Sequence, residues 1–145
     1  MAMNEGKAAP GKVVGVSLNS DGQKERLLLE ETYFEYLVES AMEGIIIADN
    51  EGRILRANNE FHKMFGFSPG EIVGQVLDEL IVPRQEMEEA VSITQRVIRG
   101  EKVALETVRQ RKDGRRIHVS IIASPIFAGE SLQAVFGIYR DISDQ

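Results

Sequence analysis

The pattern of apolar positions predicts a helix over residues 23–42, near the N-terminal end of the chain. Apolar side chains recur there at steps of three and four residues, which places Leu27, Phe34, Leu37, Val38 and Ala41 on one face of a helix. We expect this amphipathic helix to pack against a sheet or against a second copy of the chain. Residues 1–22 are rich in Gly, Ala, Ser and Lys without a clear pattern, which predicts a flexible leader.

Five further segments have the pattern of β-strands. Residues 44–49 are β-branched and apolar at successive positions, and a turn at 49–52 joins them to a partner strand at 53–58. Apolar residues alternate with other residues at 103–112, 115–124 and 132–142. The pair Asp113-Gly114 predicts a hairpin between the first two of these segments, whereas Pro125 is expected to end the second and residues 127–131 to form a loop. The chain therefore has two groups of antiparallel strands.

The middle of the chain, between the two groups of strands, has helical patterns. Asn58 or Asn59 is expected to cap a short helix, and Ser68 to Glu71 has the sequence of a capping box that opens another helical turn ending at Gly74. A further turn is predicted at 77–82. The longest helix of this region is predicted at 84–99, with an apolar face made of Met87, Val91, Thr94, Val97 and Ile98. This order of elements predicts an α+β fold, in which helices cover one face of an antiparallel sheet and leave a hollow suited to a ligand.

Composition narrows the class of function. The chain has 145 residues, a formal net charge of −6 and no cysteine. The length fits one domain with tails, and the acidic balance argues against binding to nucleic acid. The absence of cysteine excludes disulfides, a thiol nucleophile and cysteine-ligated metals. No apolar run approaches the roughly 20 residues that span a bilayer, so we expect a cytoplasmic fragment without membrane contact.

Several short motifs, in the right order and spacing, resemble those of the PAS sensory domain family. They are Gly44-Ile-Ile-Ile-Ala-Asp49, Asn58-Asn59-Glu60-Phe61, the stretch 64–74, Arg111-Lys112-Asp113-Gly114-Arg115, Ser124-Pro125-Ile126 and the stretch 137–143. The resemblance implies a PAS domain at 43–143, with a five-stranded antiparallel sheet cupped on one face by helices. Members of the family pass signals to kinase, cyclase, phosphodiesterase or transcription-control domains. Residues 144–145 would then begin a linker to an output domain in the same polypeptide.

The resemblance also implies a small pocket between sheet and helices. Combined with the alternation of the strands, the family's fold aims Arg109 at the mouth of this pocket, where it would meet a carboxylate or phosphate. The other pocket residues expected on this basis are Ile46, Ala48, Phe61, Phe65, Leu77, Leu105, Thr107, Val119, Ile121, Ala123 and Tyr139. The alternative is that these side chains fill the space and that Arg109 points to water, because protein interiors are normally close-packed.

The sequence argues against the cofactors that the resemblance brings to mind. The light-sensing flavin branch of the family needs a cysteine where this chain has Leu77, and a photoactive-yellow-protein type of chromophore needs a cysteine as well. Haem-binding relatives usually supply a histidine from the long helix, and residues 84–99 contain none. His62 and His118 lie far apart in the sequence and make a poor zinc site. We therefore expect no metal site, and the ligand, if there is one, stays unidentified.

A homodimer is the partner that the pattern favours. Phe136 and Ile138 point to the outer face of the sheet, where apolar groups need cover, and the 23–42 helix of a second subunit would supply it through Leu27, Phe34, Leu37 and Val38. An ion pair between Glu71 and Lys112 is implied by the family.

The alternative functions are a constitutive protein-interaction scaffold without ligand and a small enzyme. For the enzyme we find no nucleophile elbow, phosphate loop or triad.

Overall fold

The computed structural model of the protein describes residues 20–143. The leader expected at 1–22 lies almost wholly outside the described residues, and the expected linker at 144–145 lies outside them entirely. The chain divides into two units between Tyr36 and Leu37. The first unit contributes the described residues 20–36 of helix α1 (Ser20–Ser40), which agrees with the helix predicted at 23–42 in position but not in its single apolar face. Leu27, Leu28 and Leu29 are all exposed, so apolar side chains project from α1 in more than one direction.

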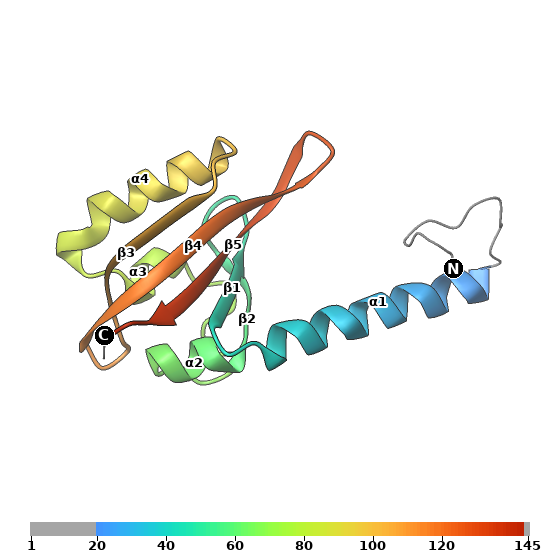
Figure 1. Cartoon of the computed structure of the whole chain (residues 1–145), viewed down its shortest axis with the longest axis horizontal. Coiled ribbons are helices and arrows are strands. Elements are labelled where there is room, and N and C mark those ends of the chain that lie inside the picture. Colours follow the sequence, from blue (N-terminus) through green and yellow to red (C-terminus); the bar gives the residue numbers. More distant parts are fainter. Residues whose placement is uncertain (1–19, 144–145) are drawn as a thin grey trace. The chain divides into compact units, whose positions relative to one another are not determined.

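The second unit is built on one five-stranded antiparallel sheet. Its strands are β1 (Gly44–Ala48), β2 (Ile54–Ala57), β3 (Val103–Gln110), β4 (Arg116–Ala128) and β5 (Ser131–Asp141). They lie side by side in the order β2-β1-β5-β4-β3 (Figure 1). The first hairpin therefore joins the last three strands only through the pairing of β1 with β5. This arrangement confirms the predicted sheet and both hairpins.

The last hairpin is longer than the sequence suggested. Pro125 was expected to end its strand, but β4 continues to Ala128 and Pro125 is paired with Val135 of β5. The predicted loop at 127–131 shrinks to a turn at Gly129, whose φ of 63° suits glycine. The strand register shifts between Ile126 and Phe127, next to the proline. Because proline has no N–H for a ladder, strands accommodate it best beside such an irregularity.

Helices from the middle of the chain cover one face of the sheet. They are α2 (Asn59–Phe65), α3 (Leu77–Ile81), the short 3₁₀ turn η1 (Arg84–Glu86) and α4 (Met87–Ile98). Helix α2 packs on β1, α3 on β3, and α4 on β3, β4 and β5. The inner face of the sheet and these helices enclose the core, whose most deeply buried side chains include Ile46, Ile54, Phe61, Phe65, Ile72, Ile81 and Val119.

Two helical predictions for this region are wrong in detail. Residues 68–74 form turns and no helix, although the backbone N–H of Ser68 donates to Oε1 of Glu71 at 2.8 Å as a capping box requires. Gly70 and Gly74 have φ values of 83° and 85°, which interrupt a right-handed helix. The buried face of α4 is also rotated: Val97 is buried as predicted, but Ala90 is buried in place of Val91, and Ile98, which the sequence placed on the apolar face, is exposed.

Candidate functional site

A cavity of about 70 Å³ lies between the inner face of the sheet and the helices. The sheet contributes Ile46 and Ala48 from β1, Arg109 from β3, Ile121 and Ala123 from β4, and the stretch 135–137 with Tyr139 from β5. The helices contribute Leu77 and Asp78 from α3, and Ala90, Ile93, Thr94 and Val97 from α4. The space has room for about two water molecules, since a water occupies about 30 Å³ of liquid. It is small and largely apolar, with a few polar groups in its wall.

The sequence located the sheet side of this cavity better than the helix side. The predicted residues that line it are Ile46, Ala48, Leu77, Arg109, Ile121, Ala123 and Tyr139. The remaining predicted residues, Phe61, Phe65, Leu105, Thr107 and Val119, are not among the lining residues. All of these except Thr107 belong to the packed core or lie against it. The lining residues that the sequence missed are Asp78, Ala90, Ile93, Thr94, Val97, Val135, Phe136 and Gly137.

Arg109 differs from both interpretations of its role. It neither stands at the mouth of the pocket nor points to water, because only 3% of its surface is exposed. Its Nη1 donates to Oε1 of Glu89 on α4 at 2.9 Å and to the carbonyl oxygen of Val108 at 2.9 Å. The other oxygen of Glu89 accepts a hydrogen bond from the hydroxyl of Thr107 at 2.5 Å. An ion pair between the buried Arg109 and the partly exposed Glu89 thus fastens α4 to β3 beside the cavity.

Asp78 and Tyr139 are the titratable groups of the wall whose pKa values are displaced. Burial raises the pKa of Asp78 above its usual range, and the charge of Arg109 offsets part of that rise. Burial likewise raises the pKa of the Tyr139 phenol well above its usual range, so this hydroxyl stays neutral. Leu77, which stands where a flavin-linking cysteine would be, lines the cavity without a thiol. Neither His62 nor His118 is among the lining residues.

A second pocket, of about 110 Å³, adjoins the cavity. The two share Ala48, Leu77, Asp78, Thr94 and Val135 as common wall. The rest of the second pocket is lined by Asp49, Glu51, Gly52, Val76 and Ile98. This second pocket, which we call the outer pocket, thus lies among the β1–β2 turn, the start of α3 and the end of α4, and it shares Asp78 with the cavity.

The aromatic side chains link the cavity to the opposite end of β1. The ring of Tyr139 meets the rings of Phe61 and Phe65 edge-on, with centroids 5.5 and 5.6 Å apart. Phe61 and Phe65 in turn stack at 4.7 Å within α2. A Cβ at Gly44 would lie 3.1 Å from the Cα of Phe61, so α2 approaches β1 as closely as a glycine allows. Cavity wall and α2 are therefore in direct contact.

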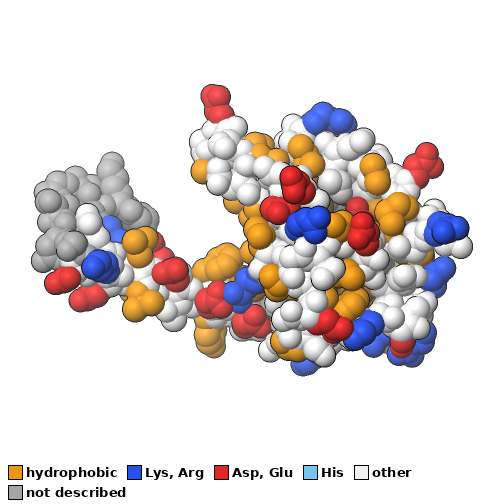
Figure 2. Space-filling model, turned by 180° about the vertical axis from the view of Figure 1, so that it is seen from behind, with side chains coloured by type: hydrophobic (Ala, Val, Ile, Leu, Met, Phe, Trp, Pro, Cys, Tyr) orange, Lys and Arg blue, Asp and Glu red, His pale blue; other side chains and the backbone are white. Residues whose placement is uncertain are grey.

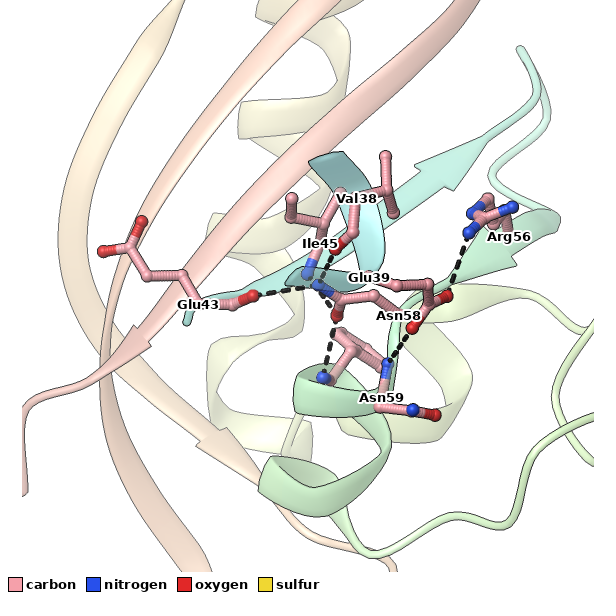
Figure 3. A network of polar contacts seen from close by, with 8 residues as sticks. Val38, Glu39, Glu43, Ile45, Arg56, Asn58 and Asn59 are labelled. Carbon is pink, nitrogen blue, oxygen red and sulfur yellow. Dashed lines mark hydrogen bonds and ion pairs between the residues drawn. The ribbon is translucent and has the colours of Figure 1, made fainter. Parts of the chain in front are cut away.

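Asn58 joins three backbone segments at the N-terminus of α2 (Figure 3). Its Nδ2 donates to the carbonyl oxygens of Val38 at 2.8 Å and Glu43 at 3.0 Å. Its Oδ1 accepts from the backbone N–H of Ile45 at 2.9 Å and of Phe61 at 3.0 Å, the second being the N-cap bond of the helix. The side chain is fully buried, and all its hydrogen-bonding capacity is used. We name Asn58 with these four partners the Asn58 junction.

Glu39 adds a second tie at the same place. One of its oxygens pairs with Nη2 of Arg56 on β2 at 2.9 Å, and the other accepts from the backbone N–H of Asn59 at 3.2 Å (Figure 3). Val38, which the sequence assigned to a dimer contact, is only 6% exposed within the second unit. That assignment is therefore wrong for Val38: the last turn of α1 is fixed to the sheet that follows it.

The predicted ion pair between Glu71 and Lys112 is present. The hydrogen bond from Lys112, assisted by the N–H of Ser68, holds the pKa of Glu71 below its usual range. The backbone N–H of Lys112 also donates to the carbonyl oxygen of Phe65 at 2.8 Å. The β3–β4 hairpin is thereby fixed to the end of α2.

Within residues 20–143, no three His, Asp or Glu side chains are grouped so that they could hold a metal ion. In the same part of the chain, no helix combines the length and the apolar character needed to cross a membrane.

Comparison with known proteins agrees with the architecture. The PAS domain of a HTR-like protein from Haloarcula marismortui superposes with a TM-score of 0.68 at 22% identity, over 83% of this chain and 98% of that one. A PAS domain from Colwellia psychrerythraea gives a TM-score of 0.71 at 22% identity, over 81% and 99% of the two chains. At these identities the likeness shows the fold alone.

Sequence comparison shows the family. The chain is 29% identical over 123 residues to the C4-dicarboxylate transport sensor protein DctS of Rhodobacter capsulatus, which covers 83% of this chain. It spans only about a fifth of the length of that relative, 19%. The sequence profile of the PAS domain matches residues 42–144. With a profile that covers most of its length and a sheet of the matching topology, the chain belongs to the PAS domain family of sensory modules.

Proposed function

We propose that this chain is the signal-input module of a larger signal-transduction protein, and that occupancy of its cavity alters the end of α1. One continuous set of contacts carries the proposal. Tyr139 lines the cavity and touches Phe61, the N–H of Phe61 is held by Asn58, and Asn58 binds the last turn of α1 through Val38. A molecule that displaces the Tyr139 ring would press on the Asn58 junction, because close-packed interiors transmit displacement.

The output would lie in the same polypeptide, as a kinase, cyclase, phosphodiesterase or transcription-control domain. Two observations support a separate output. The sensor protein that resembles the chain is several times longer, and PAS domains are sensory modules. We infer that the module itself has no catalytic role and that a kinase of a two-component system is the simplest output.

The test of sensing uses the protein as purified and one local probe. Native mass spectrometry after mild purification looks for a bound molecule, and a thermal-shift screen of small metabolites looks for stabilisation. Hydrogen exchange is then measured at the backbone N–H of Ile45, which Asn58 holds at 2.9 Å. We expect a binder to change the exchange of Ile45, because Asn58 connects this amide to Phe61, whose ring contacts Tyr139. A binder that leaves this amide unchanged would contradict the transmission route.

A homodimer is the second part of the proposal, supported by exposed apolar side chains. Leu27, Phe34 and Leu37 of α1 are between 48% and 67% exposed. Figure 2 shows apolar side chains among acidic ones along this helix. Ile138, expected on the outer face of the sheet, is half-buried in the single chain, whereas Phe136, expected beside it, is among the residues that line the cavity. Apolar surface of this extent is rare on monomeric proteins and typical of an interface.

Sedimentation equilibrium at micromolar concentration tests the dimer. We expect a dimer for the unchanged chain and a monomer for Phe34→Glu, because a charge in an apolar contact is not tolerated. The matched control is Glu35→Gln, a neighbour on the same helix. A monomer for the unchanged chain would refute this part of the proposal and leave sensing intact.

A constitutive interaction scaffold is the alternative function, and one observation favours it. The cavity is only about 70 Å³, and a cluster of three aromatic rings already fills the space beside it. If no mass copurifies and no metabolite in the screen raises Tm, the scaffold becomes the better description. The dimer test is unaffected by that result.

A further inference from the structure

The charge of the cavity is opposite to the one that the sequence predicted. Arg109 was expected to meet a carboxylate or phosphate, but its guanidinium already has a carboxylate partner in Glu89 at 2.9 Å. Glu89 is itself held by Thr107, so the ion pair is part of the folded structure and is not waiting for a ligand. An anion entering the cavity would gain little from a cation whose charge is already balanced.

Asp78 is the charged lining residue that lacks such a partner. Among the residues that the structure describes, no hydrogen bond or ion pair reaches its carboxylate. The carboxylate is partly buried, and this burial is the main cause of its raised pKa. A carboxylate in this state is unfavourable unless a donor or a positive charge is brought to it. Asp78 lies in the wall common to the cavity and the outer pocket, where a ligand that spans the two would meet it.

A second group in the wall also lacks a partner. Tyr139 is only 6% exposed, yet its hydroxyl has no hydrogen bond to any side chain or backbone group between residues 20 and 143. Its neutral phenol oxygen is free to accept a hydrogen bond from a ligand. Together, Asp78 and Tyr139 present acceptors, whereas the positive charge of Arg109 is balanced by Glu89.

The outer pocket, through which a ligand would reach this wall, is also negatively charged. The outer pocket is lined by Asp49, Glu51 and Asp78, and none of its lining residues is basic. Negative groups around a pocket raise the local concentration of cations and repel anions. The inner surroundings, by contrast, are apolar side chains such as Ile46 and Ile121.

We infer that the cavity selects a small organic ammonium ion, with the amine at Asp78 and a short apolar group against Ile46 and Ile121. This inference rests on the proposed function, since it names the ligand class of the same site. An ammonium group has donors and no acceptor, which complements a carboxylate and a phenol. The combined space of the two pockets, about 70 and 110 Å³, suits a chain of about four carbons.

Four probes with four carbons each show which ligand charge the cavity prefers: n-butylammonium, 1-butanol, butyrate and succinate. Binding of each to the full 145-residue chain is measured by calorimetry and by Tm at pH 7. We expect n-butylammonium to bind most tightly, and Asp78→Asn to weaken it roughly tenfold or more, as for loss of one charged hydrogen bond. Glu79→Gln is the control, because it removes the same charge from an exposed position of the same helix.

A second variant covers the case in which Asp78→Asn does not fold. Tyr139→Phe removes only the phenol oxygen and should weaken n-butylammonium several-fold. Tighter binding of butyrate or succinate, or equal binding of n-butylammonium by both Asp78→Asn and the unchanged chain, would overturn the inference while leaving the cavity a ligand site. No binding by any probe, together with an empty screen and no copurifying mass, would overturn the proposed sensing function as well.

Discussion

Replacing Asn58 tests the link between the end of α1 and the sheet. Asn58→Ala removes the four hydrogen bonds of a buried side chain, two to the carbonyl oxygens of Val38 and Glu43 and two from the N–H groups of Ile45 and Phe61. The loss of the N-cap alone costs about 1 kcal/mol, and each remaining buried group left without a partner costs about 1 kcal/mol or more. We therefore expect the free energy of unfolding to fall by roughly 3–5 kcal/mol, a large part of the total of a small domain.

Asn58→Asp divides this effect into its two halves. The aspartate keeps both acceptor bonds and the N-cap, but it cannot donate to Val38 and Glu43 and turns a negative charge toward their carbonyl oxygens. We expect a loss of about 2–4 kcal/mol at pH 7, concentrated at the end of α1. Hydrogen exchange should speed up near Val38 while the Phe61 amide stays protected.

The assay is urea unfolding followed by circular dichroism, with amide exchange as the local measurement. Asn59→Ala is the matched control, because this neighbouring side chain is exposed and should change stability by less than about 0.5 kcal/mol. Wild-type stability for Asn58→Asp would show that the bonds to Val38 and Glu43 do not hold the helix end. The transmission route in the proposed function would then fail.

Three more substitutions test other contacts. Glu89→Gln leaves the buried Arg109 without its charged partner and should lower the free energy of unfolding by roughly 1–3 kcal/mol in urea titration; an unchanged midpoint would show the pair to be dispensable. The pKa of Glu71 is lowered chiefly by its hydrogen bond from Lys112, so Glu71 stabilises the folded state above the unfolded pKa of 4.5, and this stabilisation is lost as pH falls through the lower folded pKa. Glu71→Gln should therefore flatten the decline of Tm below pH 4.5. A decline parallel to that of the unchanged chain would contradict this. Gly137→Ala places a methyl group 3.0 Å from a tyrosine ring carbon and should cost roughly 1–3 kcal/mol, whereas a stable variant would mean that the ring moves aside freely.

The sheet was predictable because its signals are local and repeated. Alternation placed Ile121, Ala123 and Tyr139 on one face, and the pairing of Ile121 with Tyr139 confirms that they are neighbours. The sequence Asp113-Gly114 marked its hairpin through a turn that needs glycine, here with a φ of 91° at Gly114. Strand ends were less predictable, since Pro125 is accommodated by a shift of register that no local pattern announces.

The helix side of the cavity was harder, because it depends on how each helix is rotated. A small error in the predicted rotation of α4 about its axis places Val91 on the buried face, where the structure has Ala90. Helix propensity gives no reason to expect the smaller residue there. Asp78 was missed because an acidic residue in a short helix normally faces water. Arg109 was assigned to the right strand face, but its partner Glu89 lies 20 residues away on another element, and single-sequence patterns do not pair such groups.

The pairing of β1 with β5 has a consequence for biosynthesis. Ile46 lies opposite Gly137, so about ninety residues emerge from the ribosome after the first strand before its central neighbour exists. Until then the nascent chain holds a hairpin too small to be stable in water. Closure of so long a loop is slow, and the unfinished sheet exposes apolar strands meanwhile. Folding is therefore expected to follow release of the last strand, and truncations within β5 should yield aggregates instead of a smaller domain.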